Sequence, residues 1–342
     1  MKRRSMISSS LLFALSLSVT TGCKKNSSSK PQSVAKLLGS AKLGFSAWPG
    51  WFPWQVAQEK KIFQNNNINV NLQWFDNYVD SIKALTTGKI DANCQTLADT
   101  ISAIDGGADL VVVLTNDNST GNDKIIVSSQ IKSILDLKGK KVAAEESTVD
   151  HFMLVQALQK AKMSIKDIQF IPMETSKAAD AFVAGKLDAV SVFAPFTTKA
   201  LKRPGSIELF SSKNFPGSIS DHLVFNRKFV EAYPAQVQAM VNSWFATLSF
   251  MASGENLKDA DQIMAKRAGV SLAEYQDYKD GTKIFTIAEN IEAFKNGNDI
   301  TFLSTSALET KKFLFENKLI KTDVNLSKLL DDQFITAYAN KK

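Results

Sequence analysis

One pattern occurs twice in this chain and constrains its fold more than any other feature. Residues 84–92 read Ala-Leu-Thr-Thr-Gly-Lys-Ile-Asp-Ala and residues 181–189 read Ala-Phe-Val-Ala-Gly-Lys-Leu-Asp-Ala, so Gly88 and Gly185 are 97 residues apart. Glycine often ends a helix because it accepts a left-handed backbone conformation. We therefore expect one helix-to-strand step to recur in two lobes of the same plan. Two unrelated helix ends with common capping chemistry are the alternative.

The segments around this repeat alternate between strand-like and helix-like patterns. Strands are expected at residues 41–45, 70–74, 110–114, 124–127 and 141–144 and in a run that reaches 94–96, with helices at 55–63, 79–87 and 151–162. This alternation predicts an α/β fold in which each lobe has a mainly parallel sheet flanked by helices. From Pro234 onward the apolar spacing is mostly helical, so a helical C-terminal region is expected.

These patterns also give an expected order of parts. We expect a signal peptide at residues 1–22, a flexible tether at 23–40, the first lobe at 41–126, the second lobe at 127–221, and a return to the first lobe with C-terminal helices at 222–342. The chain would cross twice between the lobes. These two crossings would form a hinge.

The N-terminal segment has the parts of a secretory signal peptide. A basic start at residues 2–4 precedes the apolar run 11–19, and small residues lead to Gly22 and Cys23. Gly-Cys resembles the processing site of bacterial lipoproteins, although Thr20 departs from the Leu or Val preferred there. We expect a periplasmic protein held at the membrane by a lipid on Cys23. Cleavage without lipidation is the alternative.

Charge and cysteine content exclude several classes of function. The formal charge falls from +7 to +4 without the three basic residues of the signal peptide, and no basic run interleaved with aromatic residues indicates nucleic-acid binding. Cys94 has no partner if Cys23 is lipidated, so stability must come from the core, for which 44% apolar residues suffice. The histidines are His151 and His222. Without a Cys or His cluster we expect neither a metal nor another cofactor.

Residues 46–54, Ser-Ala-Trp-Pro-Gly-Trp-Phe-Pro-Trp, form an aromatic loop that holds three of the chain's five tryptophans. Its two prolines lack backbone donors and fix φ, so a stiff loop is expected here and not a regular element. Rings displayed on such a loop suit ligand recognition. A hydrophobic plug against the first helix is the alternative.

Together these motifs resemble the solute-binding proteins of ABC importers for nitrate, sulfonates, taurine and thiamine-precursor pyrimidines. The resemblance covers roughly residues 42–315. It rests on the aromatic loop, both copies of the repeat, residues 134–142 (Ile-Leu-Asp-Leu-Lys-Gly-Lys-Lys-Val) and residues 193–195 (Phe-Ala-Pro). It implies a two-lobed type II periplasmic-binding-protein fold that closes on a small solute at the strand ends. It also implies a non-enzymatic protein, which we expect to be a monomer, that delivers its solute to a permease and an ATPase.

The resemblance places the ligand pocket at loops and strand ends of both lobes. The matching positions here are Trp48, Trp51, Trp54, Asp76, Gln95, Thr96, Glu146, Ser147, Asp150, Phe193 and Asp221. Several of them have structural alternatives. Asp76 could cap the helix that follows it, Ser147 and Asp150 have the spacing of a capping box, and Phe193 could belong to the core.

Arginine usage bears on the charge of the ligand. After the signal peptide, arginine occurs only at positions 203, 227 and 267, and none of these lies on the expected pocket loops. Proteins that bind sulfonate or nitrate are expected to present Arg or Lys, although a helix N-terminus can bind an anion without a side chain. Carboxylates beside aromatic faces suit a small organic cation. We expect guanidinium, because it is planar and donates two parallel hydrogen bonds to a carboxylate; the aromatic loop also resembles those of family members thought to import guanidine or urea.

Other ligands and another role stay open at this point. A quaternary ammonium ion would use the rings without donating hydrogen bonds, and a sulfonate, nitrate, urea or a pyrimidine would suit the same fold. A lipoprotein that senses its ligand and signals to a receptor would need the same hinge. A glycosidase would also need two carboxylates, but neither the repeat nor the family pattern supports one.

Overall fold

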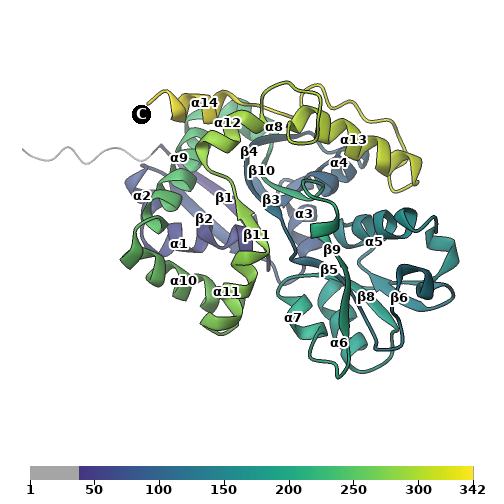
Figure 1. Ribbon diagram of the computed structural model, residues 1–342. Helices are drawn as coiled ribbons and strands as arrows, with labels where there is room; N and C mark the ends of the chain where they lie inside the picture. Colours follow the sequence, from purple (N-terminus) through teal and green to yellow (C-terminus); the bar gives the residue numbers. More distant parts are fainter. Residues whose placement is uncertain (1–37, 342) are drawn as a thin grey trace, which may run out of the picture. The chain divides into compact units, whose positions relative to one another are not determined.

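Two β-sheets define two lobes in the computed structural model, which describes residues 38–341 (Figure 1). The first sheet contains β1 (Ser40–Phe45), β2 (Asn69–Trp74), β3 (Ala92–Thr96), β4 (Leu110–Ser119), β10 (Ser220–Asn226) and β11 (Thr282–Ile284), in the order β11-β4-β10-β3-β1-β2. The second contains β5 (Asp123–Val127), β6 (Lys141–Ala144), β7 (Gln169–Pro172), β8 (Ala189–Phe193) and β9 (Ile207–Ser211), in the order β7-β6-β8-β5-β9. The expected signal peptide, Cys23 and most of the tether lie outside the described residues.

Helices flank both sheets and make up most of the C-terminal part, as the sequence predicted (Figure 1). The first lobe has α1 (Pro53–Glu59), α2 (Ile62–Asn65), α3 (Tyr78–Thr86) and α4 (Leu97–Asp105), and the second has α5 (Val149–Lys160), α6 (Thr175–Val183) and α7 (Phe196–Ala200). The C-terminal part adds α8 (Arg227–Ala232), α9 (Pro234–Met251), α10 (Gly254–Ala268), α11 (Leu272–Asp280), α12 (Ile287–Ala293), α13 (Leu303–Glu316) and α14 (Gln333–Ala339). Single 3-10 turns are η1 (Pro49–Trp51), η2 (Ile134–Leu137), η3 (Ile165–Asp167) and η4 (Ser212–Asn214).

Both sheets are mixed, but most strands of each run in one direction, and only β10, β11 and β5 run against the others. β1 pairs in parallel with β2 and β3, but β10 runs antiparallel to β3 and β4, and β5 runs antiparallel to β8 and β9. The cause is the double crossing of the chain. After each crossing the chain enters the new sheet at the edge that faces the other lobe. β3 ends at that edge of the first sheet and β8 at that edge of the second, so β10 runs antiparallel to β3 and β5 runs antiparallel to β8. β4 of the first sheet ends at Ser119, and β5 of the second sheet begins at Asp123. The chain therefore passes from the first lobe to the second between these residues, a few residues before the boundary expected at 127.

The repeat marks the same structural step in both lobes. Gly88 and Gly185 follow α3 and α6 with φ of 70° and 73°, the left-handed region that favours glycine. The Asp91 carboxylate then accepts a hydrogen bond of 2.8 Å from the NH of Lys42 in β1. Asp188 accepts one of 2.9 Å from the first residue of β6. Each aspartate therefore fixes the start of its own strand to the start of the neighbouring parallel strand.

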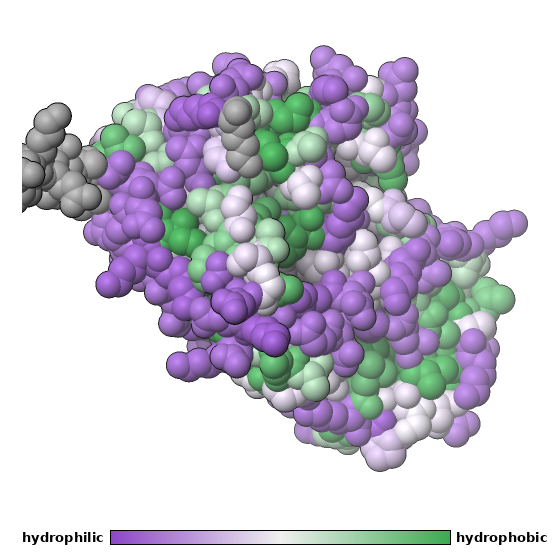
Figure 2. All heavy atoms as spheres, turned by 60° about the vertical axis from the view of Figure 1, so that its left-hand side comes forward, coloured by the Kyte–Doolittle hydropathy of each residue, from purple (hydrophilic) through white to green (hydrophobic). Residues whose placement is uncertain are grey.

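Two apolar clusters stabilise the lobes. The larger includes Trp54 and Trp244 and packs α1 and α9 beside the first sheet, and the smaller surrounds Phe182 between α6, α7 and the second sheet. On the face shown in Figure 2, hydrophilic side chains cover most of the surface and apolar side chains lie among them in separate groups. Within residues 38–341, no helix combines the length and the apolar character that crossing a bilayer requires.

Candidate ligand-binding site

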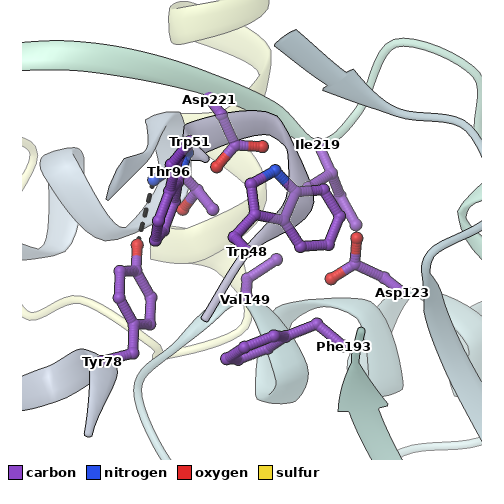
Figure 3. A pocket seen from close by; sticks show the side chains of 9 residues that line it. All are labelled: Trp48, Trp51, Tyr78, Thr96, Asp123, Val149, Phe193, Ile219 and Asp221. Carbon is purple, nitrogen blue, oxygen red and sulfur yellow. Dashed lines mark hydrogen bonds between the residues drawn. The ribbon is translucent and has the colours of Figure 1, made fainter. Parts of the chain in front are cut away.

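Four aromatic rings form a closed circle between the lobes (Figure 3). The ring centres lie 6.4 Å apart for Trp48 and Trp51, 5.4 Å for Trp51 and Tyr78, 6.1 Å for Tyr78 and Phe193, and 6.3 Å for Phe193 and Trp48. Phe193 belongs to the second lobe and the other three to the first. We call these four residues the aromatic circle, and it presents ring surface to a ligand from both lobes.

Local structure places each ring. Trp48 precedes the turn η1 and Trp51 ends it, so the two indoles lie three residues apart on a single 3-10 turn. Tyr78 is the first residue of α3, and the Asn77 side chain caps this helix by accepting a hydrogen bond of 2.8 Å from the NH of Val79. Phe193 is the last residue of β8. The circle therefore assembles where loops and elements end at the edges of the sheets, the place where open α/β sheets bind ligands.

Two buried carboxylates face the cavity that the aromatic circle lines. Asp221 in β10 and Asp123 at the start of β5 are each 1% exposed. Neither carboxylate oxygen of Asp221 makes a hydrogen bond of good geometry, nor does Oδ2 of Asp123, although the indole of Trp51 approaches Asp221 closely enough to lower its pKa. Figure 3 shows Asp221 directed between the indoles of Trp48 and Trp51, with Asp123 approaching Trp48 from the other side. Buried acceptors without donors are costly, so these oxygens are poised to accept hydrogen bonds from a ligand.

The cavity is small. Thr96, Val149 and Ile219 complete its lining. The space open to the centre of a water-sized molecule is about 10 Å³, and a cavity needs about 10–15 Å³ of such space to hold one water. The rings therefore nearly fill the site in this state, and a solute needs the lobes to move apart before it can enter.

Asp117 supports the aromatic loop from behind. Its Oδ1 accepts a hydrogen bond of 2.8 Å from the indole NH of Trp48, and its cross-strand partner is Asp221. A Cβ atom at Gly50 would lie 2.0 Å from Oδ2 of Asp117. Since no side chain fits there, only glycine lets η1 approach Asp117 closely enough to bring Trp48 and Trp51 to the cavity.

Burial raises the pKa of every carboxyl group around the cavity. The pKa of Asp99 is raised to about 6, that of Asp123 to about 7 and that of Asp117 to about 8, and the pKa of Asp221 is raised well above its usual range. Neighbouring carboxylates add to the rise at Asp117, Asp123 and Asp221, because like charges disfavour ionisation. Among the described residues, no ion pair includes any of these four groups. The protein side chains thus leave the acidic site without a neutralising cation.

Asp99 connects the two lobes. Its Oδ2 accepts hydrogen bonds of 2.8 Å from the hydroxyls of Tyr78 and Thr96. It also faces the backbone NH of Val149, the first residue of α5, and this contact offsets part of the rise in its pKa. Helix N-termini attract anions. The N-terminus of α5 therefore already faces a carboxylate from the opposite lobe.

Part of the pocket expected from the sequence lies together at this cavity. The expected residues that line it are Trp48, Trp51, Thr96, Phe193 and Asp221. They come from the aromatic loop, β3, β8 and β10, so segments from both lobes contribute.

Trp54 and Asp76 lie elsewhere. The Trp54 ring is fully buried between Phe63 and Trp244, at ring-centre distances of 5.9 and 4.8 Å, which is the arrangement of a hydrophobic plug. Asp76 is exposed and accepts a hydrogen bond of 2.7 Å from the indole NH of Trp74. Asn77 caps α3 in its place.

Gln95, Glu146 and Ser147 also lie outside the cavity lining. Gln95 is buried within β3, where its amide group bonds to Asn93 and Thr100 at 3.0 Å. Glu146 and Ser147 are exposed in the turn before α5, and Ser147 has a left-handed φ of 63°. Any ligand contact by these residues stays a prediction.

Asp150 is buried behind the N-terminus of α5. Its carboxylate accepts a hydrogen bond from the Thr175 hydroxyl, and its backbone NH donates to the Thr148 hydroxyl at 3.3 Å. Thr148 is the residue that caps α5, so Ser147 and Asp150 do not form the capping box that was their structural alternative. The chain turns at Ser147 and begins the helix one residue later than that spacing assumed.

Sequence reasoning missed several residues of the site. These are Tyr78, Asp99, Asp117, Asp123, Val149 and Ile219. A signal for two of them was present in residues 115–123, a run of small polar and acidic residues between two apolar strands. In the structure this run is buried, including Asp117 and Asp123, and a buried polar run at a lobe crossing is a feature of a binding site.

The described part of the chain has no group of three or more His, Cys, Asp or Glu side chains arranged to hold a metal ion. Although four carboxyl groups lie near the cavity, their chemistry is that of hydrogen-bond acceptors and single negative charges. What the arrangement can do is surround a small solute with rings and accept several hydrogen bonds from it.

Known proteins resemble this chain in sequence over most of its length. Residues 48–253, more than half of the chain, match the family described as NMT1/THI5 like. A binding protein of Brucella abortus (strain 2308) is 26% identical over 260 residues, which cover 74% of this chain and 78% of that protein. A protein of Escherichia coli (strain K12) that is named for binding aliphatic sulfonates is 26% identical over 250 residues, covering 72% and 74% of the two chains.

The two-lobed fold also occurs among solved structures. The alkanesulfonate-binding protein from Xanthomonas axonopodis pv. citri, solved with bound MOPS, superposes with a TM-score of 0.72 at 17% sequence identity. The superposition covers 86% of this chain and 98% of that one. At this identity the likeness shows the fold, which is the periplasmic-binding-protein fold expected from the sequence.

Proposed function

This chain belongs to the NMT1/THI5-like family, and from that membership we propose that it is the solute-binding component of an ABC importer. It captures a small solute between its lobes in the periplasm and delivers it to a permease and its ATPase, as a monomer held to the membrane through Cys23. The relatives above are named as binding proteins, which supports capture without catalysis. No bond of the solute is made or broken.

The ligand that the site suits best is a small organic cation that carries N–H donors. The observation that carries this proposal is Asp221, whose carboxyl group is buried beside the cavity with no hydrogen bond of good geometry and no cationic side chain paired with it. Oδ2 of Asp123 is also unpaired, and the described ion pairs supply no cationic side chain to either group. A buried carboxylate needs a cation or a proton. A cationic solute would supply the missing charge.

Guanidinium is the cation that we propose. It is planar and can donate two parallel hydrogen bonds to Asp221 while its face lies against an indole of the aromatic circle. Its remaining N–H groups could reach Asp123 on the other side of Trp48. Its small size suits the narrow space between the rings, which must widen when the lobes part to admit it.

A sulfonate-like anion is the second candidate, because relatives of this chain are named for sulfonates. An anion would need a positive partner in the cavity, such as Arg, Lys or a helix N-terminus. The cavity lining contains neither Arg nor Lys. Three helices start at the lining: α3 at Tyr78, α4 after its cap Thr96, and α5 at Val149. The start of α5 already faces Asp99. The lack of Arg and Lys therefore favours the cation, and the starts of α3 and α4 are the places that an anion would use.

Binding of the cation is coupled to loss of protons. With pKa values of about 6 to 8, Asp99, Asp123 and Asp117 are partly protonated near neutral pH, and the pKa of Asp221 is also raised well above its usual range. A cation favours the ionised carboxylates and displaces these protons. Its affinity must therefore rise with pH in this range, whereas the affinity for an anion must fall.

The first experiment is a thermal unfolding and calorimetry panel on the purified protein. The solutes are guanidinium, tetramethylammonium, urea, methanesulfonate, taurine and nitrate, at low millimolar concentration, far below the molar range in which guanidinium and urea denature. We expect guanidinium to stabilise the protein by about 2.7 kcal/mol at 100 times its dissociation constant, a shift of several degrees. Tetramethylammonium is expected to bind more weakly, because it cannot donate hydrogen bonds to Asp221.

The same titrations at pH 6 and pH 8 decide whether the ligand is a cation or an anion. Guanidinium is expected to bind more tightly at pH 8. Stabilisation by methanesulfonate or taurine alone, with tighter binding at pH 6, would replace the cation by an anion and leave the role as a solute-binding protein in place.

A further inference from the structure

Tyr278 makes a contact between the lobes that lies apart from the ligand cavity. It belongs to α11, which leads into β11, and β11 pairs with β4 of the first sheet. Its hydroxyl donates a hydrogen bond of 2.9 Å to the Thr198 hydroxyl in α7 of the second lobe. Neither residue is among those that line the cavity. The bond therefore joins the lobes without touching the ligand.

The backbone of Tyr278 is tied to the first crossing between the lobes. Nδ2 of Asn122, between β4 and β5, donates to the carbonyl oxygen of Tyr278 at 2.6 Å and lies 2.7 Å from the Thr282 hydroxyl. The NH of Thr120 donates to the carbonyl of Gly281 at 2.9 Å, and a Cβ atom at Gly281 would lie 2.3 Å from Oδ1 of Asn122. The end of α11 is thus packed directly against the crossing about which the second lobe must turn.

Tyr275, one turn earlier on α11, faces the first lobe. Its ring centre lies 6.2 Å from that of Phe52 in the aromatic loop, and its hydroxyl donates to Sδ of Met264 in α10 at 3.2 Å. One helix therefore carries a tyrosine bonded within the first lobe and a tyrosine bonded to the second. Tyr275 is a matched control for Tyr278.

We propose that the Tyr278 hydroxyl is a closure latch, a positioning group that bonds Thr198 when the lobes close on the solute and releases it when they open. The proposal rests on the function proposed above, because it requires lobes that open and close. Asn122 keeps the backbone of Tyr278 at the crossing, whereas Thr198 moves with the second lobe. A bond present only in the closed state slows the release of every ligand by the same factor and leaves the choice between ligands unchanged.

The test compares Tyr278→Phe and Thr198→Val with Tyr275→Phe in the full protein. Stopped-flow tryptophan fluorescence with guanidinium as the probe gives the association and dissociation rates. Each of the first two variants is expected to raise the dissociation constant about 3- to 10-fold, the effect of one hydrogen bond, through faster dissociation. The double variant is expected to lose no more than either single variant. Tyr275→Phe is expected to bind like the wild type.

Small-angle X-ray scattering supplies a readout that a merely structural role would not change. At equal ligand saturation, Tyr278→Phe is expected to have a larger open fraction than Tyr275→Phe, and the ligand-free proteins can be compared in the same way. Wild-type dissociation rates in both latch variants, or additive losses in the double variant, would overturn the latch. If another solute of the panel binds in place of guanidinium, the latch predicts the same factor for that solute, so a wrong ligand and a wrong latch give different results.

Discussion

At the scale of single residues, Asp221 unites three properties that rarely occur together. It is 1% exposed, neither of its carboxylate oxygens makes a hydrogen bond of good geometry, and its strand neighbour Asp117 is also acidic. Burial and the charges of nearby carboxylates raise its pKa. A buried carboxyl group of this kind lowers the stability of the free protein, and on the function proposed above a bound cation would offset that cost.

Asp221→Asn separates binding from folding. Without the charge, the affinity for guanidinium is expected to fall more than about tenfold, since a hydrogen bond to a charged group contributes about 1.5–3 kcal/mol. The stability of the free protein is expected to fall less as pH rises, because the substitution removes one buried carboxyl group that would ionise beside Asp117. Isothermal titration and urea unfolding measure the two effects. Unchanged affinity would remove Asp221 from the site.

Asp76→Asn is the matched variant for a carboxylate that the sequence placed in the pocket. Asp76 is exposed and bonded to Trp74, so the structure gives no reason for a loss of affinity. If this variant binds as weakly as Asp221→Asn, the pocket expected from the sequence is the better description.

The aromatic loop shows why the sequence identified some of these residues and not others. The loop itself and two of its rings could be predicted, because proline and glycine define the turn and the rings are conspicuous. The direction of each ring could not. Trp48 and Trp51 flank one 3-10 turn and face the cavity, whereas Trp54 begins the next element and packs against Trp244 in α9. That partner lies far away in the sequence, so only the tertiary fold reveals it.

At the scale of elements, the turn η1 requires glycine at position 50, because Asp117 lies where a side chain would be. The Cβ atom that Gly50 lacks would lie 2.0 Å from Asp117, whose other oxygen is held by Trp48. Gly50 has no positive φ, so its requirement comes from this close approach and not from its backbone conformation. The turn and β4 are therefore fixed against each other by a contact between a backbone and a carboxylate.

Gly50→Ala is expected to lower the free energy of unfolding by about 1–3 kcal/mol, the usual cost of overpacking. It should also weaken ligand binding, since Asp117 and Trp48 must move together. Urea unfolding measures the first effect and calorimetry the second. Gly254→Ala is the control, because a Cβ atom at Gly254 in α10 meets nothing within 4 Å. A wild-type unfolding curve for Gly50→Ala would mean that the turn shifts freely away from β4.

The sheets show a second limit of the sequence. Strand positions and the repeated helix-to-strand step could be predicted, because apolar runs, glycine and aspartate are local signals. Strand direction could not, because nothing in β5 or β10 itself records from which side it enters a sheet. Their antiparallel pairing follows from the two crossings between the lobes.

At the scale of the whole molecule, the buried carboxyl groups make stability depend on pH. Asp99, Asp123 and Asp117 have pKa values raised to about 6, 7 and 8, against about 3.9 in an unfolded chain. Between these values the folded state binds more protons than the unfolded state, so the free energy of unfolding falls as pH rises. Burial lowers the pKa of His151 to about 4 and that of His222 to about 3. These lowered values make the free energy of unfolding rise with pH, but only up to about pH 6.5, the pKa of histidine in an unfolded chain. Above that pH the histidines no longer change the stability.

We therefore expect the ligand-free protein to lose about 1–3 kcal/mol of stability between pH 6.5 and pH 8.5. Urea unfolding at the two pH values measures this change. Asp117→Asn, which lacks the group with a pKa of about 8, should show a smaller loss. A gain in stability over this interval would mean that these carboxyl groups ionise freely in the folded protein.

The contact of Asp99 with the start of α5 has one more consequence for the choice of solute. Because Asp99 belongs to the first lobe and α5 to the second, every closing of the lobes brings a carboxylate to that helix N-terminus. A group attached to the same chain acts at an effective concentration of millimolar or more. On the function proposed above, an anionic solute would have to compete with this attached carboxylate, so we expect Asp99 to disfavour anions when the lobes close.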